Sequence, residues 1–336
     1  MSDRAARTVV VTQRFFDEET ISYLDAHGCE VRLADLPPGK ADGELTEETL
    51  LQTLAHADGW IVGHARVTRQ LLSRLPRLQV IARRGVGYER VDTAAVKDLG
   101  KVAAIAVGGN DACVADHALA LMLAVNHRLR ESQLQMNAGS WAILTGTDLY
   151  RKTVGIVGLG RIGRGVVQRL KGFETRILAV TANPDPGWSR QHGVEHVGLD
   201  TLLALSDVVS LHAPLTDGTR RLIDAGALAR MKPTAILVNT ARGGLVDDAA
   251  LLDALKAVRI AGAGLDVYLS ESDPAYTGVT AELIALPNVV ATPHSGASTR
   301  EGLIRTNRIA AQCVVAVLEG REPPAACVIA DGRPRA

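Results

Sequence analysis

An arginine, a histidine and acidic side chains follow separate short apolar runs in the second half of the chain. Arg242 comes directly after the stretch 238–241 and precedes two glycines, which let the backbone and a ligand come close. A guanidinium grips a carboxylate through two parallel hydrogen bonds. His294 follows Thr-Pro, and imidazole is the natural acid or base near neutral pH. With Asp266 and Glu271 of the stretch 264–271, these residues favour a catalytic site over a surface arginine and a structural histidine.

A phosphate-binding loop is predicted upstream of these residues. Gly158, Gly160 and Gly163 form Gly-x-Gly-x-x-Gly between the apolar run 154–157 and a helical pattern over 164–171. The first glycine permits a tight turn, the second leaves room for a pyrophosphate, and the third lets helix and strand pack closely. The helix N-terminus offers unpaired N–H groups to the phosphates. The sequence therefore predicts a dinucleotide site.

The elements that must position these residues alternate between strands and helices. Strands are expected first at 9–12, 30–34, 59–62, 80–82 and 102–106, and after the buried helix 112–128 at 154–157, 176–180, 207–211, 235–239, 261–265 and 288–291. Six strands is the count of a full doubly wound nucleotide domain. The predicted fold is therefore α/β, with two doubly wound parallel-sheet domains. A dinucleotide-binding domain (105–295) is inserted into a discontinuous substrate domain (1–104 and 296–336).

Composition excludes several classes of protein. The 336 residues carry 37 Lys plus Arg and 37 Asp plus Glu, so no electrostatic attraction to nucleic acid or to an anionic membrane is expected. No apolar run reaches the ~18 residues of a membrane span, and the first residues lack the apolar core of a signal peptide. The cysteines lack metal-ligand spacing, so no metal is expected and a reducing, cytoplasmic location is predicted. They are Cys29, Cys113, Cys313 and Cys327.

Several long motifs make the chain resemble the D-isomer-specific 2-hydroxyacid dehydrogenases over almost its full length. They are GLGRIG at 158–163, NTARGGLVD at 239–247, GLDV at 264–267 and TPHSGAST at 292–299. RRGVGYERVD at 83–92, GGN at 108–110 and HSGASTRE at 294–301 are similar to the phosphoglycerate dehydrogenase branch. The resemblance implies hydride transfer between NAD(P)(H) and a D-2-hydroxy acid/2-keto acid pair, such as 3-phosphoglycerate, glyoxylate or hydroxypyruvate. An NAD(H)-sensing, dimeric corepressor-like protein of the same fold is the alternative.

The same resemblance assigns roles to individual residues. Arg242 binds the substrate carboxylate, His294 exchanges a proton with the substrate oxygen, and Glu271 pairs with the histidine. The implied cofactor-binding residues are Gly158, Gly160, Arg161, Ile162, Gly163, Thr181, His212, Pro214, Thr240, Ala241, Asp266 and Gly296. The implied substrate-binding residues are Arg83, Val86, Gly87, Gly109 and Asn110.

Cofactor choice and assembly depend on departures from the family pattern. Thr181 stands where an acidic residue usually binds the ribose hydroxyls, which favours NADP over NAD. The usual arginine is also absent, and Arg190 is the nearest candidate. Family members dimerise through a segment that corresponds to about 105–150, so a homodimer is expected. His117, within the apolar stretch 112–125, is interpreted as a core histidine.

Overall fold

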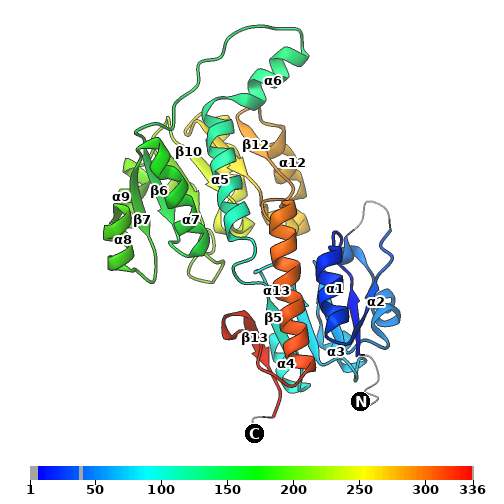
Figure 1. The fold of residues 1–336 in the computed structure, drawn as a ribbon. Coiled ribbons are helices and arrows are strands. Elements are labelled where there is room, and N and C mark those ends of the chain that lie inside the picture. Colours follow the sequence, from blue (N-terminus) through cyan, green and yellow to red (C-terminus); the bar gives the residue numbers. More distant parts are fainter. Residues whose placement is uncertain (1–6, 38–40, 335–336) are drawn as a thin grey trace. The chain divides into compact units, whose positions relative to one another are not determined.

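The computed structural model describes residues 7–37 and 41–334, which form two compact α/β units. Unit 1 contains the chain up to Asn110 and from Ala297 onward, and unit 2 contains Asp111–Gly296. Figure 1 shows unit 1 in blue, cyan and red, and unit 2 mainly in green and yellow. The predicted α/β class with two sheets is confirmed. Unit 2 begins at Asp111, whereas the sequence placed residue 105 onward in the nucleotide half.

A six-stranded sheet forms the centre of unit 1, in the order β13-β5-β4-β3-β1-β2. Its strands are β1 (Arg7–Val11), β2 (Cys29–Leu33), β3 (Gly59–Val62), β4 (Val80–Arg83), β5 (Val102–Ile105) and β13 (Val328–Asp331). β13 pairs antiparallel with β5, and the other pairs are parallel. The sequence did not predict β13, a four-residue antiparallel edge strand inside a tail that reads as proline-rich.

Helices with side-chain N-caps cover the sheet of unit 1. They are α1 (Glu18–Ala26), α2 (Glu47–Leu54), α3 (Arg69–Ser73), α4 (Thr93–Asp98) and α13 (Arg300–Leu318), with 3-10 turns η1 (Asp42–Glu44) and η6 (Ala325–Cys327). Asp or Thr caps each of the five α-helices by accepting a backbone N–H of the first turn. α13 packs on β3, β4 and β5 and beside α1 (Figure 1). The late helix therefore belongs to unit 1.

A parallel sheet of seven strands forms the centre of unit 2, in the order β12-β11-β10-β9-β6-β7-β8. Its strands are β6 (Thr153–Val157), β7 (Arg176–Val180), β8 (Val194–His196), β9 (Val208–Leu211), β10 (Ile236–Asn239), β11 (Gly262–Leu265) and β12 (Val289–Ala291). Six of them were predicted. The sequence missed β8, because a three-residue edge strand is too short to show a periodicity.

Unit 2 contains eight α-helices within the described residues. They are α5 (Asp111–Asn126), α6 (Leu129–Asn137), α7 (Arg161–Leu170), α8 (Pro186–His192), α9 (Leu199–Leu205), α10 (Ala225–Arg230), α11 (Asp248–Lys256) and α12 (Thr277–Ala285). Four 3-10 turns join them: η2 (Lys171–Phe173), η3 (Gly243–Leu245), η4 (Leu269–Glu271) and η5 (Pro274–Tyr276). α5 packs on α7 and on β10, β11 and β12.

One part of unit 2 leaves its core. α6 and the coil that follows it extend away from the sheet before the chain returns to β6 (Figure 1). We call residues 128–147 the arm. Across the described residues, no helix combines the length and the apolar character needed to cross a membrane.

Candidate active site

The predicted catalytic residues leave three neighbouring strands at the same edge of the unit 2 sheet. β10 and β11 pair so that Asn239 lies level with Leu265, and β11 and β12 pair so that Leu265 lies level with Ala291. Arg242 follows the end of β10, and the other two catalytic candidates follow the ends of β11 and β12. The three segments therefore lie together at the carboxyl edge of the sheet, which is the edge where such sheets bind ligands.

His294 and Glu271 are in direct contact. The Nδ1 atom of His294 lies 2.6 Å from the Oε2 atom of Glu271. The backbone N–H of Tyr268 donates to the other carboxylate oxygen at 2.9 Å, because the η4 turn folds Glu271 back onto its own start. Burial raises the pKa of the Glu271 carboxyl, but the hydrogen bonds from His294 and Tyr268 outweigh it and hold that pKa below its ordinary value. The carboxylate therefore stays ionised at neutral pH.

The backbone at His294 is strained and is held by Asp266. His294 has φ +53°, in the left-handed region that side chains rarely adopt. Its N–H donates to the backbone oxygen of Asp266 at 2.8 Å. The N–H groups of Ser295 and Gly296 donate to the carboxylate of Asp266 at 2.8 and 2.9 Å. Asp266 is only 2% exposed, and its hydrogen bonds outweigh burial and lower its pKa. This carboxylate was predicted to contact the cofactor. In the structure, it fixes residues 294–296, which we call the histidine loop.

The segment that carries Arg242 is fixed by its own strand end. The Asn239 side chain accepts the N–H of Ala241 at 3.0 Å and donates to the backbone oxygen of Arg242 at 2.9 Å. A Cβ atom on Gly243 would overlap the backbone of Tyr268, at the start of the η4 turn. Glycine there lets the arginine segment pack directly on the turn that holds the glutamate.

The glycine loop has the geometry expected of a phosphate cradle. Gly158 has φ +97°, and a Cβ atom on Gly163 would overlap the backbone oxygen of Gly158. Gly160 is the N-cap of α7 and provides no side-chain cap, so the first N–H groups of this helix are open to a ligand. A Cβ atom on Gly160 would meet no atom within 4 Å. The backbone at Gly160 is therefore open on the side where a ligand could approach.

Two predicted cofactor contacts have polar atoms without a partner. The Nδ1 atom of His212 and the hydroxyl of Thr240 are buried and make no hydrogen bond with the described residues. The Nε2 atom of His212 lies 2.9 Å from the Ser210 hydroxyl, and burial lowers the pKa of the ring to about 4. A neutral imidazole and a hydroxyl with spare hydrogen-bonding capacity fit a bound dinucleotide. Pro214 and Ala241 lie on the same two strand exits, after β9 and β10.

A cavity of about 710 Å³ adjoins the glycine loop and contains an arginine that sequence reasoning missed. Arg164 lines it together with Arg161 and Asn183. The Arg164 guanidinium lies 3.0 Å from the Asp185 carboxylate and 4.8 Å from the centre of the Trp188 ring. Arg190, the candidate suggested by the sequence, is exposed on α8 and does not line this cavity. The sequence could not identify Arg164, because only the fold brings α7 beside the start of α8.

The predicted substrate-binding residues follow two adjacent strands of unit 1. Arg83, Val86 and Gly87 are at or beyond the end of β4, whereas Gly109 and Asn110 follow β5. The Nε atom of Arg83 donates to a backbone oxygen after β3 at 3.1 Å. The backbone oxygen of Gly109 accepts from Arg305 of α13 at 3.0 Å. These residues thus share the carboxyl edge of their own sheet.

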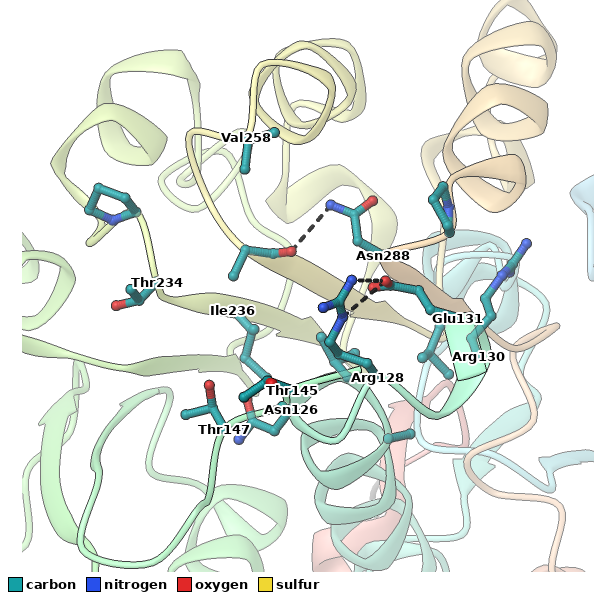
Figure 2. Close-up of a pocket in the computed structure, with 17 residues that line it drawn as sticks. Asn126, Arg128, Arg130, Glu131, Thr145, Thr147, Thr234, Ile236, Val258 and Asn288 are labelled. Carbon is teal, nitrogen blue, oxygen red and sulfur yellow. Dashed lines mark hydrogen bonds and ion pairs between the residues drawn. The ribbon is translucent and has the colours of Figure 1, made fainter. Parts of the chain in front are cut away.

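A second cavity of unit 2, of about 390 Å³, lies at the opposite edge of the sheet (Figure 2). Thr234 and Asn288, just before β10 and β12, line it together with residues of the arm. Arg128 pairs with Glu131 at its wall. It includes no residue predicted for catalysis or for cofactor binding.

The described residues also contain no group of three or more potential ligands that converge on a metal position.

Comparisons with known proteins found similar sequences over most of the chain. Residues 119–296 match the sequence profile described as "D-isomer specific 2-hydroxyacid dehydrogenase, NAD binding domain". D-3-phosphoglycerate dehydrogenase of Mycobacterium tuberculosis is 39% identical over 306 residues, which cover 90% of this chain and 56% of the relative. Glyoxylate reductase of Thermococcus litoralis is 39% identical over 268 residues, 77% of this chain and 80% of the relative.

Solved structures share the fold over almost the whole chain. The apo-structure of D-lactate dehydrogenase from Escherichia coli superposes with a TM-score of 0.82 at 30% identity, covering 95% of this chain and 98% of that one. The chain spans about half the length of the phosphoglycerate dehydrogenases that it matches. The matches give no support to the corepressor-like alternative.

Proposed function

Because the chain belongs to the D-isomer specific 2-hydroxyacid dehydrogenase family, we propose that it transfers a hydride between a nicotinamide dinucleotide and a D-2-hydroxy acid/2-keto acid pair. The observation that carries this proposal is the 2.6 Å contact between His294 and Glu271 beside the Arg242 strand end. Candidate acids are 3-phosphoglycerate, glyoxylate or hydroxypyruvate, and a bulkier 2-keto acid.

In the proposed reduction, Arg242 grips the carboxylate of the 2-keto acid and polarises its carbonyl group. His294, charged and oriented by Glu271, gives a proton to the carbonyl oxygen while the carbonyl carbon gains the hydride. In the oxidation, neutral His294 takes the hydroxyl proton. A bound nicotinamide supplies or accepts the hydride, so the side chains need only bind, orient and move one proton.

For the cofactor, the open N-terminus of α7 suits the pyrophosphate, and the unpartnered atoms of His212 and Thr240 offer further hydrogen bonds. Arg161, Ile162, Thr181, Pro214 and the neighbouring glycines complete the proposed cofactor set. For the substrate, we propose Arg83 and the backbone of Val86, Gly87, Gly109 and Asn110 of unit 1. Arg83 suits a phosphorylated or otherwise anionic substrate tail.

We propose NADP as the preferred cofactor. Neither Thr181 nor Asn183, just after β7, carries a carboxylate, so the repulsion of a 2′-phosphate that is usual at these positions is missing. Arg164 lines the same cavity as Asn183 and provides the cation that the sequence pattern lacked. A 2′-phosphate would compete with Asp185 for its guanidinium.

We propose that the protein is a homodimer formed through the arm. Trp141 is 82% exposed and Ile143 is 96% exposed, although both are large apolar side chains. Apolar residues gathered on a projecting segment are typical of an interaction surface, and two-fold dimers are the commonest assemblies.

The cysteines are free and buried, which suits a reducing compartment, and we propose the cytoplasm.

Assays with NADH and NADPH in parallel test the function. Purified protein is mixed with phosphohydroxypyruvate, hydroxypyruvate, glyoxylate and a bulkier 2-keto acid, and cofactor oxidation is followed by absorbance. We expect at least one pair to turn over, and we expect His294→Asn to abolish turnover while cofactor affinity persists. Binding of cofactor without oxidation by any acid would overturn the proposal.

A further inference from the structure

We propose that His117 is a positioning residue for His294 and acts through Thr292 and Asp266. The inference rests on the proposed function, because it assumes that His294 transfers the proton. It changes the interpretation of His117, which the sequence suggests to be a core histidine. His117 comes from α5, whereas its partners follow β12 and β11.

A directed chain of hydrogen bonds links His117 to the histidine loop. The Nε2 atom of His117 lies 2.9 Å from the Thr292 hydroxyl, and that hydroxyl donates to Oδ1 of Asp266 at 2.6 Å. Since one hydroxyl has one proton, the Nε2 atom must be the donor in the first bond. The ring thus carries its proton on Nε2, which also lies 3.4 Å from Oδ1 of Asp266. His117 therefore fixes the direction of the Thr292 hydroxyl.

Asp266 needs these donors because it is buried. A carboxylate that is 2% exposed must be surrounded by hydrogen bonds or positive charge. The donors are the N–H groups of Ser295 and Gly296 and the Thr292 hydroxyl, and the Nε2 atom of His117, which donates to that hydroxyl, lies 3.4 Å from the same carboxylate. Loss of one side-chain donor leaves the carboxylate free to rotate away from the loop. The loop would then lose the contacts that hold its left-handed residue.

Packing gives a second link between His117 and the loop. A Cβ atom on Gly296 would lie 3.0 Å from Oδ2 of Asp266 and 3.3 Å from the ring of His117. The imidazole thus lies against the loop two residues beyond His294. Its side chain is 21% exposed, so this ring is not a fully buried part of the core. Since α5 packs on β10, β11 and β12, the helix that carries the ring is anchored to the strands that carry the catalytic candidates.

Three variants test the proposal by steady-state kinetics with the best acid from the panel. His117→Phe keeps a ring but removes the donor, His117→Gln restores an N–H donor, and Thr292→Val removes the hydroxyl. We expect His117→Phe and Thr292→Val to lower kcat about ten- to a hundredfold, as small misplacements of catalytic groups do. KM for the cofactor should change by less than about twofold, and His117→Gln should recover most of the loss. His127→Phe is the matched control, because His127 is an exposed residue just beyond α5.

The double variant separates coupling from general damage. If His117 acts through Thr292, the losses of His117→Phe and Thr292→Val are not additive, and the double variant resembles either single variant. Additive losses, or a His117→Gln variant as slow as His117→Phe at an unchanged Tm, would overturn the proposal.

Amide hydrogen exchange tests the proposal without any substrate. His117→Phe should accelerate exchange at Ser295 and Gly296, whose N–H groups bind Asp266. Unchanged exchange would refute the positioning role even if no acid were turned over. Faster exchange in a protein that reduces no acid would instead refute only the proposed function.

Discussion

The Nδ1 atom of His294 lies 2.6 Å from the Glu271 carboxylate, and Glu271→Gln tests whether this charge supports the proposed proton transfer. Glutamine can still accept from Nδ1, but it cannot stabilise a charged ring. We expect kcat for reduction to fall about ten- to a hundredfold with unchanged cofactor affinity. Because the pKa of Glu271 lies below its ordinary value, the wild-type carboxylate remains charged as the pH falls through 5. The deficit of Glu271→Gln should therefore persist from about pH 5 upward. Equal kcat values for the two proteins would contradict this role.

Asp248, at the start of α11, should make the stability of the protein fall as the pH rises. Its carboxylate is buried and accepts the N–H of Leu269 at 2.9 Å. Burial, with smaller contributions from Asp247 and Glu271, raises its pKa from 3.8 to about 6. Between these two values the native state binds more protons than the unfolded state, so this group's contribution to stability falls as the pH rises through that window.

Asp248→Asn removes this titration and keeps an oxygen that can accept the N–H of Leu269. Relative to the wild type, the variant should therefore gain stability between about pH 4 and pH 6, by about 3 kcal/mol in total, and then stay level. Thermal unfolding of both proteins across this range gives the difference in Tm. A difference that is constant with pH would show that Asp248 does not titrate there.

Single residues could be predicted where their chemistry is local. Arg242 and His294 were identified because their types follow strand ends, and the structure brings His294 to Glu271. The roles of all three remain predictions. The network of Asp266 could not be predicted, because His117 and Thr292 are 175 residues apart and meet only through the packing of α5 on the sheet.

Elements were predictable where their patterns are long. The strand–turn–helix around Gly158 and the apolar helix α5 are clear in the sequence, and both lie where expected. The two missed strands, β8 and β13, have three and four residues. Such strands are defined by the edge that they pair with more than by their own residues.

In our proposal, the residues near the end of β7 determine whether NADP or NAD is preferred. Arg164→Ala tests this proposal. If Arg164 binds a 2′-phosphate, the variant should raise KM for NADPH about tenfold or more and leave KM for NADH nearly unchanged. Arg190→Ala is the matched control, since Arg190 is exposed and lies outside the cavity. Equal effects of Arg164→Ala on both cofactors would assign the guanidinium to the packing of Trp188 instead.

For the whole molecule, we predict that the arm controls the oligomeric state. The arm leaves the core of its own unit (Figure 1) and exposes large apolar side chains. Replacing Trp141 and Ile143 by serine removes the two most exposed of these side chains without touching a core residue. The wild type should have twice the 35.6 kDa mass of one chain by light scattering, and the double variant should have the single mass. Leu33→Ser, an exposed apolar residue of unit 1, should leave the mass unchanged. A monomeric wild type, or a double variant that stays dimeric at low micromolar concentration, would contradict an interface built on the arm.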